Sequence, residues 1–112
     1  CSPEETMGWL EKMAVLAKSN SIDVIMMTPL LIDPSLAKRC WIPDVDYDAV
    51  NEKLKTLRNL MLEYANKNGV RIIDAQDMFL QLYTKENVSA YLLDGLHPTV
   101  LGHEEIARFL PY

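Results

Sequence analysis

Two short apolar segments set the strongest limit on what this chain can fold into. Residues 22–28 read Ile-Asp-Val-Ile-Met-Met-Thr and residues 70–73 read Val-Arg-Ile-Ile, compositions that favour β-strands. The first segment is apolar on both faces, which is typical of a buried parallel strand, and Pro29 ends it. A long helical pattern lies between the two segments. Strands that alternate with helices predict a parallel α/β sheet.

The helix between the two strands has the clearest pattern in the sequence. Its apolar residues recur every three or four positions and form one stripe: Tyr47, Val50, Leu54, Leu57, Met61 and Tyr64. Asp46 is a suitable N-cap, and Asn68-Gly69 is a typical helix end.

Three further helices are predicted from capping signals. Residues 2–5 (Ser-Pro-Glu-Glu) form a capping box that begins a helix running to about Ser19. Asp77 is predicted to open a short helix through Tyr83, and Thr99 to cap a last one. Residues 29–45 contain three prolines and no sustained period, which predicts a long loop of the kind that often carries function.

Only two strands are predicted in 112 residues, which is enough chain for one domain. Two parallel strands make a poor sheet, because both faces need covering and both edges stay open. We therefore expect that the chain pairs with another chain, or that it is the C-terminal portion of a larger doubly wound domain. Its first residue is Cys1 rather than Met, which favours a start partway through something longer.

Charge and composition exclude several classes of partner. The net charge is −5, and the basic residues form no stripe, so a nucleic-acid surface is not expected. The longest apolar stretch, residues 22–32, is interrupted and too short to span a membrane. The two cysteines, Cys1 and Cys40, exclude a Cys-x-x-Cys zinc site, while a single bridge between them stays open.

The sequence Asp94-Gly-Leu-His97-Pro98 carries the most specific chemical signal. An aspartate three residues before a histidine can reach the ring Nδ1, fix the tautomer and leave Nε2 free as a general base. Pro98 keeps His97 out of the α region and so holds the ring on a defined loop.

This string, followed by Gly102 and then Ala107, resembles the final conserved block of the SGNH hydrolases, the GDSL esterase and lipase superfamily. The resemblance covers essentially the whole chain and implies a flavodoxin-like, doubly wound parallel sheet. It also implies that His97 and Asp94 complete a Ser-His-Asp triad acting on a small carboxylic ester, without a metal or organic cofactor.

Two blocks of that family are absent from the sequence. Neither the Gly-Asp-Ser nucleophile block nor the Gly-x-Asn-Asp oxyanion block occurs. Residues 1–112 therefore resemble a single partial domain, the C-terminal half with two strands and three to four helices. Such a chain is expected to be inactive alone and to associate with the missing half or with itself. The alternative is a truncated or degenerate module that binds a partner without catalysis.

Other residues have competing interpretations. The segment Trp41-Ile42-Pro43 is a candidate substrate loop, because the corresponding loop lies on the active-site side in relatives, and core or interface packing is equally favoured. Asp74 is interpreted as a helix cap, His103 as a surface or packing residue, and Cys40 as packed rather than nucleophilic. A generic flavodoxin-like binding domain would leave the Asp94 and His97 pair unexplained.

Overall fold

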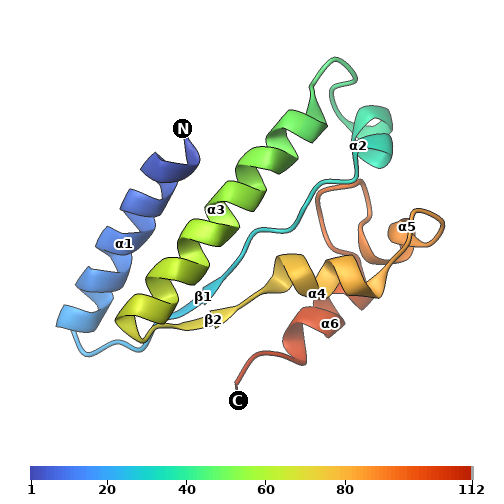
Figure 1. Cartoon of the computed structure of the whole chain (residues 1–112). Coiled ribbons are helices and arrows are strands. Elements are labelled where there is room, and N and C mark those ends of the chain that lie inside the picture. The colour runs from blue at the N-terminus through green and yellow to red at the C-terminus, as the bar shows by residue number, and fades with distance from the viewer. Residues whose placement is uncertain (112) are drawn as a thin grey trace.

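The structure is a computed structural model and describes residues 1–111. The elements, in chain order, are α1 (Pro3–Ser19), β1 (Ile25–Met27), α2 (Pro34–Cys40), α3 (Tyr47–Asn68), β2 (Arg71–Ile73), α4 (Ala75–Leu82), α5 (Val88–Tyr91) and α6 (Val100–Ala107). Figure 1 shows α1 and α3 side by side on one side of the strands, with α4, α5 and α6 grouped beyond the strand ends.

The two strands form a parallel sheet, as the sequence predicts. Ile25 pairs with Arg71, Met26 with Ile72, and Met27 with Ile73. The long helix α3 connects them. The fold is therefore mixed α/β with a two-stranded parallel sheet, and the predicted fold class is confirmed.

Two apolar clusters hold the chain together. The first joins α1, β1 and α3 through buried Met7, Ala14, Met26 and Met61. The second joins α2, α4, α5 and the segment after α5 through buried Leu36, Phe79, Val88 and Leu92. The second cluster supports the segment between α5 and α6.

The helix ends follow the capping signals closely. The Ser2 hydroxyl accepts from the Glu5 amide, and the Glu5 carboxylate accepts from the Ser2 amide, so the capping box is complete. Asp46 caps α3, which ends at Gly69 with φ of 65°. Thr99 caps α6 through the Gly102 amide.

Several element predictions were wrong in detail. Within the expected loop of residues 29–45, α2 forms because Asp33 accepts from the Leu36 amide and Pro34 occupies the first turn. Helix α4 begins at Ala75 rather than at the predicted Asp77, because Asp74 is its N-cap. The short α5 was not predicted either, so the described residues hold six helices.

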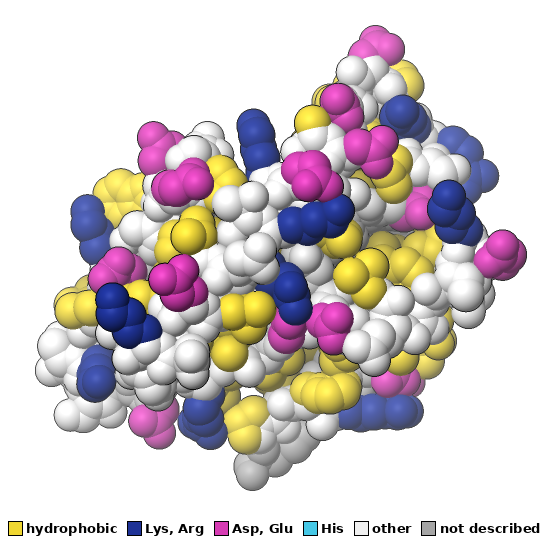
Figure 2. Space-filling model, in the orientation of Figure 1, with side chains coloured by type: hydrophobic (Ala, Val, Ile, Leu, Met, Phe, Trp, Pro, Cys, Tyr) yellow, Lys and Arg dark blue, Asp and Glu magenta, His cyan; other side chains and the backbone are white. Residues whose placement is uncertain are grey.

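The first strand is not buried on both faces as predicted. Met26 is buried against α1 and α3, whereas Ile25 is 37% and Met27 46% exposed. Other large apolar side chains are also exposed, among them Trp9, Met13 and Leu16 of α1. On the face of the molecule drawn in Figure 2, hydrophobic side chains lie between acidic and basic ones.

Candidate active site

Asp94 and His97 form a closed, hydrogen-bonded turn. Asp94 Oδ1 accepts from the backbone amides of Leu96, at 2.9 Å, and His97, at 2.8 Å. Asp94 Oδ2 lies 2.8 Å from His97 Nδ1. One carboxylate therefore fixes both the backbone and the imidazole of the same turn.

The electrostatics of this turn favour one tautomer. The pKa of Asp94 lies well below its usual range, mainly because the carboxylate accepts a hydrogen bond from the His97 amide. Desolvation raises this pKa, whereas the hydrogen bonds from the His97 imidazole and the Leu96 amide lower it further. An ionised carboxylate can only accept hydrogen bonds, so His97 Nδ1 carries the shared proton. Nε2 of the neutral ring is then an acceptor, on a side chain that is 63% exposed.

Backbone contacts close the turn on itself. The Leu93 amide donates to the His97 carbonyl at 2.8 Å, and Leu92 forms an antiparallel bridge with Pro98. The Thr99 amide donates to the Tyr91 carbonyl at 2.9 Å. The catalytic candidates thus sit on a short β-like loop rather than on a free segment.

Two glycines permit close backbone approaches around this loop. Gly95 has φ of 89°, and a Cβ there would lie 2.7 Å from the Asp33 carbonyl oxygen and 2.8 Å from the Ala37 nitrogen. A Cβ on Gly102 would lie 2.5 Å from the Tyr91 carbonyl oxygen. The first glycine lets the turn rest on α2, and the second lets α6 rest on the end of α5.

The candidate substrate loop lies partly beside this turn. The rings of Trp41 and His97 have centroids 5.7 Å apart and are tilted by 44°. Trp41 is 51% and Ile42 61% exposed, and Pro43 is exposed as well. The structure therefore brings Trp41 to the imidazole, with Ile42 and Pro43 following on the surface.

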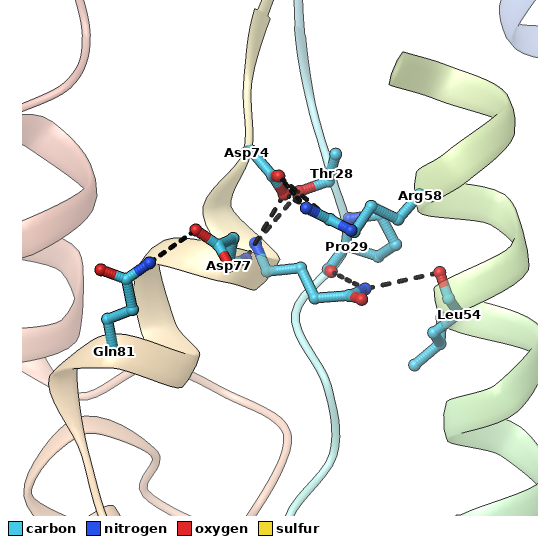
Figure 3. A network of polar contacts seen from close by, with 8 residues as sticks. Thr28, Pro29, Leu54, Arg58, Asp74, Asp77 and Gln81 are labelled. Atoms are coloured by element: carbon cyan, nitrogen blue, oxygen red, sulfur yellow. Dashed lines mark hydrogen bonds and ion pairs between the residues drawn. The ribbon is translucent and has the colours of Figure 1, made fainter. Parts of the chain in front are cut away.

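A polar network that sequence reasoning missed joins the carboxyl ends of the strands (Figure 3). Asp74, directly after β2, forms an ion pair with Arg58 of α3 and accepts from the Thr28 hydroxyl at 3.0 Å. The Arg58 guanidinium is the main cause that lowers the pKa of Asp74. The predicted cap is present too, since Asp74 Oδ1 accepts from the Asp77 amide at 3.3 Å. No sequence signal pairs Arg58 with Asp74, because Arg58 is one charged residue beside the apolar stripe of α3.

The remaining candidates from the sequence are the two cysteines and His103. Cys1 and Cys40 are exposed free thiols, so the bridge left open by the sequence is not formed, and the interpretation of Cys40 as packed is wrong. His103 is exposed on α6. Within residues 1–111, no group of three or more His, Cys, Asp or Glu side chains is placed to hold a metal ion. No helix in the same range is both long and apolar enough to cross a membrane.

Three solved structures with the same fold are larger than this chain. An acylhydrolase from Bacteroides fragilis matches with a TM-score of 0.75 and 26% identity, over 95% of this chain and 48% of that one. A GDSL-like lipase from Bacteroides thetaiotaomicron gives a TM-score of 0.70 and 25% identity, over 95% and 49%. An acetyl-xylooligosaccharide esterase from Geobacillus gives a TM-score of 0.73 and 20% identity, over 96% and 44%.

These neighbours define one class, the enzymes described as acylhydrolases, esterases and lipases. No protein-family model and no curated protein matches the sequence. The chain shares the fold of these enzymes, which supports the predicted resemblance to the SGNH hydrolase superfamily, and it spans about half the length of these solved structures. It corresponds to the C-terminal half of that fold.

Proposed function

We propose that this chain supplies the general base and its orienting acid to a Ser-His-Asp hydrolase of carboxylic esters. The observation that carries the proposal is the Asp94–His97 turn. The carboxylate occupies Nδ1 at 2.8 Å, and the opposite edge of an exposed imidazole is left as a proton acceptor. The family resemblance supports the same chemistry.

In this reaction His97 transfers the protons, and a serine from another segment forms the covalent bond to the acyl group. His97 Nε2 takes the proton of the serine hydroxyl as its oxygen attacks the ester carbonyl carbon. The imidazolium then gives that proton to the leaving alcohol, and an acyl-serine remains. His97 next removes a proton from water, which attacks the acyl-serine, and returns it to the serine oxygen as the acid leaves. Asp94 stays ionised and stabilises each imidazolium.

The substrate side of the proposal concerns Trp41. A group that protonates the leaving oxygen lies next to the alcohol part of the substrate, so Trp41, Ile42 and Pro43 would line the alcohol side of the pocket. One neighbour is an acetyl-xylooligosaccharide esterase. We infer a small carboxylic ester, such as an acetylated sugar, a short acyl ester or a lysolipid. The residues offer no reason to invoke a metal or organic cofactor.

The nucleophile and the oxyanion donors must come from another segment. The sequence has no Gly-Asp-Ser and no Gly-x-Asn-Asp string. Exposed Ile25 and Met27 on β1 offer an apolar strand to the missing half of the sheet. In this proposal residues 1–112 are one partial domain that associates with that half. The absent nucleophile is also what favours the alternative, a binding module without catalysis.

The test uses the chain alone and the chain combined with a segment that contains a Gly-Asp-Ser block. The 112-residue chain should not hydrolyse p-nitrophenyl acetate above background. The combined protein should, and His97→Ala should abolish that turnover, with His103→Ala as the matched control. Turnover by the chain alone that is lost in His97→Ala would contradict the proposal. A combined protein that folds but lacks turnover would favour the binding module.

A further inference from the structure

The segment that carries α2 is held by α3 at two points, one on each side of α2. Before α2, the Asn51 side-chain amide donates to the Ile32 carbonyl, and its oxygen accepts from the Ile32 amide, each at 2.8 Å. After α2, the Tyr47 hydroxyl accepts from the Ile42 amide at 3.3 Å. Both backbone contacts therefore start from neighbouring positions of one helix.

The positions and burial of Tyr47 and Asn51 suit them to hold the backbone on both sides of α2. They are four residues apart on α3 and so lie on the same face of the helix. Tyr47 is 6% and Asn51 9% exposed, although both carry polar groups. Buried polar side chains are retained where they are hydrogen-bonded, and here every one of these bonds goes to the backbone that flanks α2.

The held segment contacts the Asp94–His97 turn at both of its ends. At its start the Asp33 amide donates to the Gly95 carbonyl at 2.9 Å, and Gly95 packs closely on Asp33 and α2. At its end the ring of Trp41 lies against His97. Figure 1 shows α2 beside the N-terminal end of α3, and the connection between α5 and α6 passes close to α2.

We propose that Asn51 and Tyr47 are positioning residues for His97, in the ester hydrolysis proposed above. They fix the segment that carries α2, and this segment holds the backbone of the turn at Gly95 and places the Trp41 ring beside the imidazole. Neither residue touches the substrate. Displacement of a base by as little as about 1 Å is enough to slow proton transfer strongly.

The first test observes the positioning directly by NMR of the 112-residue chain. The unaltered chain should show a nuclear Overhauser effect between the Trp41 and His97 rings and a protonated Nδ1 in His97. Asn51→Asp keeps the acceptor but removes the donor to Ile32, and Tyr47→Phe removes only the hydroxyl. Both variants should weaken the ring-to-ring effect and broaden the Nδ1 proton signal. Asn66→Asp, the same change at an exposed position of α3, should leave both signals intact.

A merely structural role would lower the melting temperature of these variants and leave the two His97 signals unchanged below it. That result would overturn the proposal, and because Tyr47→Phe keeps the buried ring, the test does not depend on Asn51→Asp folding. In the combined enzyme, both variants should lower kcat by about tenfold with little change in KM. If the combined enzyme has no activity, the proposed function fails, while the NMR result still decides the positioning role.

Discussion

Asp94 makes all of its hydrogen bonds within its own turn. Its two oxygens are shared among the amides of Leu96 and His97 and the ring of His97. Asp94 therefore has two roles: it shapes the loop as an Asx-type turn, and it sets the tautomer of the His97 ring. The spacing of the two residues in the sequence predicted the ring contact, because three residues are the span of one such turn.

Asp94→Asn should separate these two roles. The amide oxygen can still accept from the backbone amides, but its NH2 group can donate to His97 and so favours the wrong tautomer. In the combined enzyme we expect kcat to fall by about 10⁴-fold with the fold retained. Measurement of kcat with p-nitrophenyl acetate and of the far-ultraviolet circular dichroism would test this. Asp48→Asn, an exposed carboxylate in the first turn of α3, is the matched control and should be neutral.

Other residue-scale features could not be read from the sequence. Arg58 looks like one more charged residue on the flank of an amphipathic helix, and only the fold brings it to Asp74, sixteen residues later. The same holds for Trp41 and His97, which are 56 residues apart in the sequence. Their rings come together because Trp41 directly follows α2, which packs on the turn that carries His97. Local spacing predicts contacts within one turn of chain, whereas contacts across elements need the packing.

At the scale of elements, the Arg58–Asp74 pair ties α3 to the end of β2. Arg58→Ala should lower the free energy of unfolding by about 2 kcal/mol at pH 7, because the partly buried carboxylate loses a charge-assisted partner. Urea titration would measure this. Lys55→Ala is the matched control, since the Lys55–Glu52 pair is exposed and should contribute less than about 0.5 kcal/mol.

The same pair predicts a pH dependence with a definite sign. Arg58 lowers the pKa of Asp74, so the folded state binds this proton more weakly than the unfolded chain does. The stabilisation is complete above the ordinary carboxyl pKa of about 4 and is lost as the pH falls further. The cost of Arg58→Ala should therefore shrink between pH 7 and pH 3. A cost that is equal at both pH values would contradict the assignment of the pKa shift to this pair.

Three glycines offer a graded test of the close contact between α2 and the Asp94–His97 turn, with Gly95 at the contact and the other two away from it. Gly95→Ala meets both a positive φ and backbone atoms at 2.7–2.8 Å, and we expect a loss of more than about 3 kcal/mol. Gly69→Ala has a positive φ but open space, and should cost about 1 kcal/mol. Gly8→Ala has open space on a helix and should stabilise the chain by up to about 1 kcal/mol. Thermal unfolding of the three variants would establish the order.

The element predictions succeeded where a capping residue and a long period coincide, as in α1 and α3. They failed for α2, because a helix of seven residues is too short to show a period and two of the three prolines of residues 29–45 lie outside it. The Asp33-Pro34 pair was nonetheless a usable start signal. The burial of β1 was overestimated because its apolar composition is typical of a strand that is covered on both faces of a complete sheet. In this chain only the face that carries Met26 is covered.

At the scale of the whole molecule, the two-stranded sheet leaves apolar surface uncovered. Ile25 and Met27 of β1 are exposed, as are Trp9, Met13 and Leu16 of α1. We expect the isolated chain to self-associate with rising concentration. Sedimentation velocity from about 5 to 200 μM would measure this, and lysine at both Ile25 and Met27 should shift the chain toward the monomer. Val100→Lys, at another exposed apolar position, should leave the association unchanged, and a wild-type monomer across the range would contradict the prediction.

The closed turn at Asp94 has a consequence for how such an enzyme would come into being from two pieces. Since the acid and the base are joined by bonds made within residues 94–97, their geometry exists before any second piece arrives. Binding of the other piece would then be the slow, concentration-dependent event, and turnover would follow it without further rearrangement of the base. When the two halves are mixed, the rate at which ester hydrolysis appears would therefore report the rate at which the halves associate.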